Sequence, residues 1–314
     1  MSQFNDDVRL PAGSTDSPEA QNPANEMKPD TGGESSVLGS QNSGYVTAVE
    51  MFPYPPEKTY PEDLQISWSW AHFLVFVVFG FASLVAIQGA LALAYAPHQR
   101  MTSKQFEEYL LSKPQFAIGS MVLWYAAIFL FLYVTLSLLR GHAFWETLGW
   151  RKLAPTGLGM PRNPLAYLFA GGGLSLFINL LTYRLKPPDN TPIEELFKHR
   201  ETAMLFVGMA VLIAPLVEET LFRGYLYPMF ARSFGITPAI LLTGILFGLM
   251  HGAQLGWTWS FVALLTTVGI IFTLVRARTG TVWASFLMHL GYNGLISVAA
   301  VVSTHGFTQM PTGK

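Results

Sequence analysis

The stretch LIAPLVEETLFRGYLYP, residues 212–228, places two adjacent glutamates and an arginine inside an apolar run. An ionisable residue at the centre of a membrane span costs about 2.5–3.5 kcal/mol on insertion scales, and it usually faces the protein interior or a watered cavity. Glu219 and Arg223 are four residues apart in the order that favours pairing on a helix, whereas Glu218 is rotated by about 100°. We therefore predict that Arg223 holds Glu219, while Glu218 points into a cavity and acts as a base. The alternative is a helix end at headgroup level.

Two histidines lie further along the chain, and each has a partner at helical spacing. Phe247 and His251, in FGLMH, share one helix face next to a row of glycines that admits a neighbouring helix. His289 and Asn293, in HLGYN, are also four residues apart, and together they could donate hydrogen bonds to a developing oxyanion. The simpler interpretations are a satisfied core histidine and an asparagine that binds another helix.

Together these side chains predict the hydrolysis of a peptide bond within a membrane. One carboxylate and one imidazole would activate water, and the second imidazole with the amide would hold negative charge. Other hydrolytic sites lack their parts, because the sequence has no Cys, no HExxH motif and no Asp after Asp189. Ser285 precedes His289 by four residues, but without a nucleophile elbow this is a weak signal.

The elements that must position these residues are predicted to be membrane spans. The chain is 51% hydrophobic and 12% charged, against about 25% charged for an ordinary soluble domain. Runs long enough for the roughly 20 residues of a span occur at 70–96, 116–139, 164–183, 202–230, 236–275 and 279–303. The run at 236–275 is too long for one span and divides at the turn signal 252–259.

We therefore predict an all-α fold, a multi-pass transmembrane helical bundle with about seven spans and a disordered N-terminal tail. The tail covers residues 1–66, which are polar and rich in Pro, Ser and Gly. Residues 67–200 would form the N-terminal transmembrane helices and a short interfacial helix at 191–197, and residues 201–304 the catalytic transmembrane core. The expected location is the cell (plasma) membrane.

Charge and composition also limit the partners. A net charge of −1 without clustered Lys and Arg argues against nucleic acid. The expected partners are membrane lipid and a protein or peptide substrate in the membrane.

The three pieces resemble the motifs of the CPBP family, the CAAX-protease and bacteriocin-processing endopeptidases, also called the Abi family. Its motifs EExxxR, FxxxH and HxxxN match EETLFR at 218–223, FGLMH at 247–251 and HLGYN at 289–293, in that order. The resemblance covers about residues 200–303. It implies a CAAX-protease-like intramembrane endopeptidase. Glu218 and His251 would activate the attacking water, and His289 and Asn293 would form the oxyanion site. Glu219, Arg223 and Phe247 would support them.

The resemblance also raises metal dependence, because the family is often described as metallopeptidases. Glu218, His251 and His289 are the N and O ligands that could hold zinc. No ligand spacing demands a metal, and a glutamate-centred mechanism explains the same residues. Metal dependence is therefore left open.

Two other classes of function compete with the endopeptidase. A catalytically silent membrane scaffold or bacteriocin-immunity-type protein would keep the fold without the chemistry, although no motif residue is lost here. A proton-coupled transporter could use Glu218 and His251 as a proton relay. The sequence has no matched pair of interrupted helices of the kind that marks inverted-repeat transporters.

Overall fold

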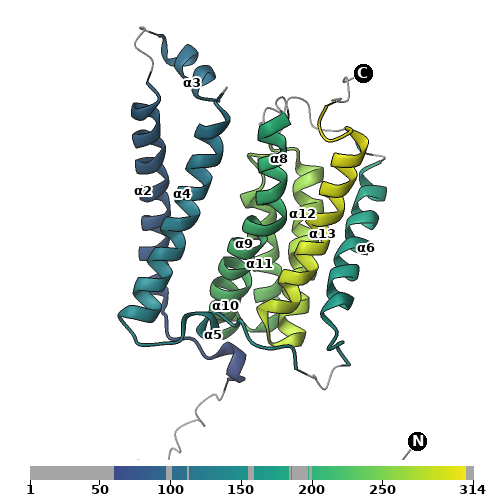
Figure 1. The fold of residues 1–314 in the computed structure, drawn as a ribbon. Coiled ribbons are helices and arrows are strands. Elements are labelled where there is room, and N and C mark those ends of the chain that lie inside the picture. The colour runs from purple at the N-terminus through teal and green to yellow at the C-terminus, as the bar shows by residue number, and fades with distance from the viewer. Residues whose placement is uncertain are drawn as a thin grey trace, which may run out of the picture. The chain divides into compact units, whose positions relative to one another are not determined.

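A computed structural model describes residues 60–96, 101–111, 113–154, 159–183, 185, 197 and 200–308. Every regular element in these residues is a helix (Figure 1), so the predicted all-α class is confirmed. Residues 1–59 of the predicted tail lie outside the described residues, as does the predicted interfacial helix at 191–197 apart from Phe197.

Six helices in the described residues are long and apolar enough to cross a membrane. Five of them are α2 Trp70–Ala94, α4 Pro114–Leu132 with its π-helical continuation η2 Tyr133–Leu138, α6 Pro164–Thr182, α12 Trp259–Thr279 and α13 Val282–Ser303. The sixth is one long helix over residues 200–234. It consists of α8 Arg200–Gly208, η3 Met209–Ile213, α9 Ala214–Glu219, η4 Thr220–Leu226 and α10 Tyr227–Phe234. The shorter elements are η1 Glu62–Leu64, α3 Ser103–Leu111, α5 Phe144–Thr147 and α11 Ile236–Met250.

Helix α11 makes the seventh pass, which agrees with the predicted number, but it is short. Its 15 residues rise about 22 Å at 1.5 Å each, less than the roughly 30 Å of the hydrocarbon layer. The predicted division of the run at 236–275 is confirmed, because α11 ends at Met250 and α12 begins at Trp259. The intervening turn contains His251 and Gln254, which line a cavity of the site described below.

The helix that carries the glutamates is continuous from α8 to α10, but it contains two π-helical segments, η3 and η4. The sequence predicts a kink at Pro215. That proline stands in the first turn of α9, directly after η3, and Pro228 stands in the first turn of α10, directly after η4. Proline removes a backbone donor and crowds the preceding turn. A widened turn accommodates this change, and such segments occur often at functional sites. Glu218 and Glu219 end the short α-helical piece between the two.

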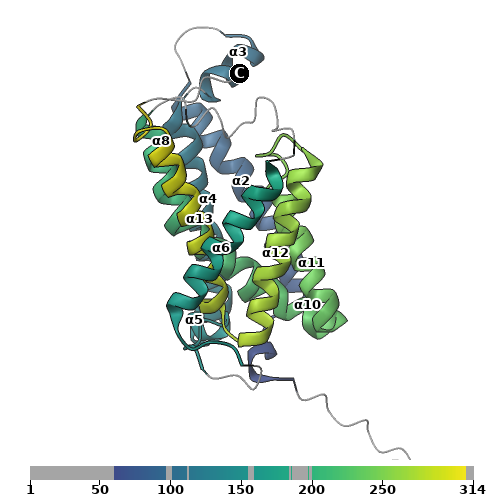
Figure 2. The ribbon, with the colours of Figure 1, turned by 90° about the vertical axis from the view of Figure 1, so that its right-hand side faces the viewer.

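Glycines set the closest helix contacts. A Cβ atom at Gly171 of α6 would collide with the backbone of Met288, and one at Gly291 of α13 would collide with the backbone of Leu168. The crossing of α6 and α13 thus requires these two glycines. Helix α11 packs against α12 in the same way, at Gly244 among others (Figures 1 and 2).

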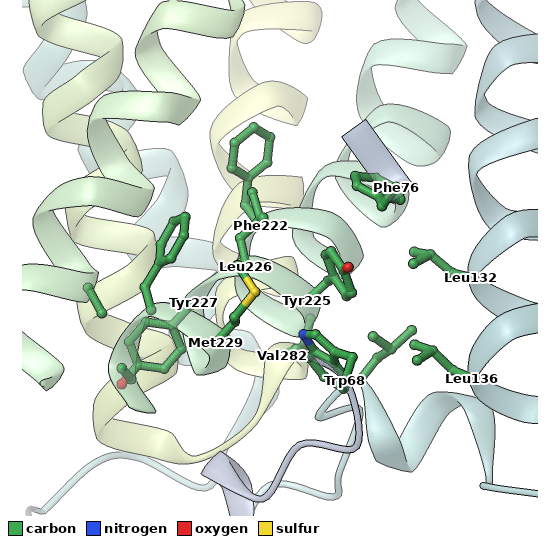
Figure 3. Packing of buried hydrophobic residues seen from close by; sticks show 14 of the residues in the cluster. Trp68, Phe76, Leu132, Leu136, Phe222, Tyr225, Leu226, Tyr227, Met229 and Val282 are labelled. Atoms are coloured by element: carbon green, nitrogen blue, oxygen red, sulfur yellow. The ribbon is translucent and has the colours of Figure 1, made fainter. Parts of the chain in front are cut away.

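The largest hydrophobic core in the described residues lies around η4 and α10, below α9 in Figure 1. Figure 3 shows Tyr225 of η4 on the side of Trp68, which precedes α2, and Leu132 of α4, with Phe222 and Leu226 of η4 beyond it. The Trp68 and Tyr225 rings stack with centroids 5.1 Å apart. This core therefore joins the first two spans to the helix that carries the glutamates.

The exposed surface suits lipid. Large apolar side chains project from α2 and α6, among them Leu74, Val78, Phe81, Phe169 and Leu180. Such a surface would be unfavourable in water. Trp257 and Trp259 lie exposed in the turn before α12 and at its start, a position typical of interfacial aromatics. The protein is a multi-pass membrane protein.

The end of the predicted tail needs correction. Residues 60–66 are described, and they pack against the bundle. Leu64 is 4% exposed, and Asp63 accepts a hydrogen bond of 3.0 Å from the buried Arg276. A polar composition concealed these contacts, because one apolar side chain and one ion pair are enough to fix a short segment.

Candidate active site

The predicted ion pair between Glu219 and Arg223 is present and fully buried. Arg223 Nη1 donates to Glu219 Oε1 at 2.9 Å, and both side chains are 0% exposed. The same guanidinium donates from Nε to Thr273 Oγ1 at 3.2 Å and from Nη2 to the Gly269 carbonyl at 2.8 Å. A buried charge needs a partner and full hydrogen bonding. Arg223 has both, so it fixes this helix against α12.

Aromatic rings complete the surroundings of Arg223. Its guanidinium carbon lies 4.6 Å from the Phe247 ring centroid and 5.4 Å from that of Phe272, within the range of cation–π attraction. The Phe247 ring also lies 4.7 Å from the His251 ring and 5.8 Å from the His289 ring. Phe247, predicted as a supporting residue, thus contacts the cation and both histidines.

Glu218 faces the two histidines. His251 Nε2 lies 3.9 Å from Glu218 Oε1, and His289 Nε2 lies 3.8 Å from Glu218 Oε2. The Glu218 side chain is 17% exposed, whereas that of Glu219 is 0% exposed. Both separations are too long for a direct hydrogen bond, and a water molecule can bridge such a separation. Adjacent glutamates therefore have different surroundings, as their rotation on the helix predicts.

The hydrogen bonds fix which ring nitrogens carry protons. His251 Nδ1 lies 2.8 Å from the Phe247 carbonyl oxygen, which can only accept, so Nδ1 is the donor. His289 Nδ1 lies 3.0 Å from Glu219 Oε1, and a carboxylate also only accepts. In the neutral form of each ring, Nε2 therefore bears the lone pair that faces Glu218.

Glu218, His251 and His289 carry donor atoms of the kind that bind a metal ion. Two Nε2 lone pairs and one carboxylate are suitable donors for zinc. The spacing is wider than a ligand set requires, and within the described ranges no group of three His, Cys, Asp or Glu side chains is placed to hold a metal. The arrangement does not form a metal site in this geometry, so the mechanism below uses protein groups alone.

Asn293 lies one turn beyond His289 and lines the same cavity. Its Nδ2 donates to the Ala210 carbonyl at 2.7 Å. Ala210 belongs to the π-helical segment η3, where a widened turn changes the backbone partners. One amide hydrogen of Asn293 is thus already committed, and one remains for a substrate. Ser285, by contrast, donates to the Val282 carbonyl at 3.1 Å.

Two cavities meet at Glu218. Cavity A has a volume of about 380 Å³ and extends from Glu218 between α8, α12 and α13. Cavity B has a volume of about 310 Å³ and extends between α2, α4 and α11. Residues that line both are Met121, Tyr125, Glu218, His251 and Gln254. Glu218 is therefore accessible from two sides.

Sequence reasoning brought together Glu218, His251, His289 and Asn293, and the structure places all four on cavity A. Several residues of the site were missed: Tyr125 and Gln254, which line both cavities, and Gly269, Phe272 and Thr273, which contact Arg223. No charge or spacing in the sequence marked them. Gly269 contributes only its backbone carbonyl to Arg223.

Residues 200–295 match the family described as "Type II CAAX prenyl endopeptidase Rce1-like". The resemblance drawn from the three motifs is confirmed for this region. The matched Rce1-like region runs from α8 into α13 and contains every motif residue. Helices α2 and α4 lie outside it.

One curated relative matches part of the chain. The UPF0177 protein YbdI of Lactococcus lactis subsp. lactis (strain IL1403) is 33% identical over 94 residues, which are 30% of this chain. The aligned part is 48% of that protein, so the chain spans about half the length of the curated relative it matches. No solved structure matches the chain. The likeness to known proteins therefore concerns mainly the region that holds the site.

Proposed function

We propose that the protein is an intramembrane endopeptidase that hydrolyses peptide bonds of membrane-associated proteins or peptides. The observation that carries this proposal is the position of Glu218, whose carboxylate faces two imidazole Nε2 atoms at 3.9 and 3.8 Å in a cavity lined by residues of the candidate membrane spans. A carboxylate in a span needs a functional reason. The Rce1-like match over residues 200–295 supports the same class of enzyme.

In the proposed mechanism, Glu218 is the general base. A water between Glu218 and His251 donates one hydrogen to the carboxylate and one to the Nε2 lone pair of His251, which orients its oxygen lone pair. That oxygen attacks the scissile carbonyl carbon as its proton passes to Glu218. The π electrons of the carbonyl move onto its oxygen. The C–N bond then breaks, and the leaving nitrogen takes the proton from Glu218.

His289 and Asn293 would stabilise the negative oxygen. Asn293 has one amide hydrogen left for this purpose. His289 gives its Nδ1 hydrogen to Glu219 and can donate from Nε2 only as an imidazolium.

The experiment that tests the proposal measures cleavage of a library of quenched fluorescent membrane peptides by the purified protein in liposomes. Wild type is compared with Glu218→Gln, and both are repeated after chelation and after zinc is added back. Cleavage by wild type alone supports the endopeptidase. Loss of that cleavage on chelation, with recovery on zinc, would replace the metal-free mechanism by one in which Glu218, His251 and His289 hold zinc.

The competing functions predict other results. A scaffold or immunity-type protein would fold and bind membrane proteins but cleave no peptide in either form. A transporter would move a solute or protons when a pH gradient is applied to the liposomes. We further propose that the protein resides in the plasma membrane, which cell fractionation with a tagged full-length chain would test.

A further inference from the structure

The predicted oxyanion site is short of donors. Groups that stabilise an oxyanion must be preorganised hydrogen-bond donors, and hydrolytic sites commonly supply two. Asn293 already donates one amide hydrogen to the Ala210 carbonyl, and His289 donates its Nδ1 hydrogen to Glu219. With a neutral His289, the two residues together offer one hydrogen. A second donor must come from elsewhere in the cavities.

Tyr125 lines the cavities next to Glu218, where a donor to the oxyanion is needed. It lies near the middle of α4 and lines both cavities where they meet at Glu218. Met121, one turn earlier on the same helix face, does the same. Glu218 of α9 lines both cavities as well. Tyrosine and carboxylate thus face the same space from opposite elements.

The Tyr125 hydroxyl is also free to bind a substrate. A largely enclosed tyrosine hydroxyl usually has a hydrogen-bond partner. Within the part of the chain that the structure describes, neighbouring groups supply none to Tyr125, whereas the hydroxyl of Tyr225 lies 2.7 Å from His72 Nδ1. A phenol remains protonated at neutral pH and can therefore donate.

We propose that Tyr125 donates a hydrogen bond to the carbonyl oxygen of the scissile peptide bond and stabilises the negative charge that develops there. This inference rests on the proposed endopeptidase function. When water adds to the carbonyl carbon, the π electrons move onto the oxygen and the water proton goes to Glu218, while the Tyr125 hydrogen stays on its own oxygen. Tyr125 is thus a catalytic residue supplied from outside the Rce1-like region.

Gln254 is the other donor shared by the two cavities. It lies in the turn between α11 and α12, whereas Tyr125 stands on a regular helix. Donors on helices hold their position more closely than donors on turns. We therefore assign the oxyanion contact to Tyr125, and Gln254→Leu provides the comparison.

The test uses a peptide that the wild-type protein cleaves in liposomes, and a phosphinate analogue in which a tetrahedral phosphinyl group replaces the scissile amide. Tyr125→Phe is expected to lower kcat about 10- to 100-fold with little change in KM, and to weaken inhibition by the phosphinate by a similar factor. Tyr133→Phe is the matched control, because Tyr133 is two turns further along, 44% exposed and outside both cavities. Gln254→Leu tests the competing donor, and the assignment requires that it weaken inhibition by the phosphinate less than Tyr125→Phe does.

Two results would overturn the assignment. Tyr125→Phe could retain the wild-type kcat, or it could lower activity without changing phosphinate inhibition. Either result, with Glu218→Gln inactive, would remove Tyr125 from the oxyanion site and leave the endopeptidase in place. Equal cleavage by Glu218→Gln and wild type would instead reject the proposed function itself.

Discussion

One imidazole ring, that of His289, connects two neighbouring carboxylates: its Nδ1 lies 3.0 Å from Glu219 and its Nε2 lies 3.8 Å from Glu218. The pair of glutamates is therefore divided between two environments. Glu219 belongs to a buried network with Arg223, and Glu218 belongs to the cavity surface. Substitutions at the two positions should separate chemistry from stability.

The first prediction concerns these glutamates. Glu218→Gln should lower peptide cleavage about 10²- to 10⁴-fold, because it removes the general base, and leave the melting temperature nearly unchanged. Glu219→Gln should cost about 3–5 kcal/mol of unfolding free energy, since it leaves Arg223 buried without a counter-charge. Cleavage assays and thermal unfolding in detergent measure the two effects. Equal loss of stability in both variants would contradict the division.

The second prediction concerns Arg223, which donates to three different groups. A lysine could pair with Glu219 but could not also reach Gly269 and Thr273, because an ammonium lacks the planar fork of arginine. Arg223→Lys should therefore lower the unfolding free energy by about 2 kcal/mol. The exposed Arg278→Lys serves as the control. A similar melting temperature for the two variants would argue against the network.

The same network makes a prediction for the charge swap. Glu219→Arg combined with Arg223→Glu keeps the ion pair in reverse, but it would place a carboxylate against the Gly269 carbonyl, where two acceptors would face each other. We expect the double variant to remain destabilised and inactive. Recovery of wild-type cleavage would show that the ion pair alone is sufficient.

The fourth prediction concerns the segment before α2. Asp63 pairs with the buried Arg276, whereas the neighbouring Glu62 pairs with Arg151 through a side chain that is 81% exposed. Asp63→Asn should cost about 3 kcal/mol and make residues 60–68 sensitive to protease. Glu62→Gln should cost at most about 1 kcal/mol. Limited proteolysis with mass mapping reads out both, and equal sensitivity would contradict the assignment.

The last prediction uses two glycines of one triplet. Gly171 has no room for a Cβ atom, whereas Gly173 has open space around it. Gly171→Ala should destabilise the protein by about 1–3 kcal/mol through the displaced α6–α13 crossing. Gly173→Ala should be neutral or stabilising by up to about 1 kcal/mol. Thermal unfolding of the two variants side by side provides the measurement.

Hydrophobicity and spacing predicted much of this structure. The spans follow from the length of the apolar runs, which the bilayer fixes, and the pairing of Glu219 with Arg223 follows from helical geometry. The chain turn between α11 and α12 was visible as a cluster of glycine, polar residues and tryptophan. These features are local in sequence, so local patterns were enough.

Contacts between distant elements could not be predicted in this way. Tyr125 sits in an apolar span with no motif around it, and only the cavity that α4 lines together with α9 and α11 brings it near Glu218. Asp63 lies 213 positions from Arg276 in the chain. The hydrogen bond from Asn293 to the Ala210 carbonyl involves a π-helical turn, and no residue type in the sequence predicts such a turn.

The short helix α11 has a consequence for hydration. Because α11 ends at Met250, the turn that follows brings His251 and Gln254 to the wall of cavity A, which extends along α8 and α13 as far as Phe206 and Ala300. Beyond Glu218 in the other direction along the helix, the aromatic core around Tyr225 and Tyr227 fills the space. The proposed endopeptidase would therefore receive its water through cavity A, from the end of the bundle where α8 begins and α13 ends. Its substrates would be peptide segments that end or unwind at that end of the bundle.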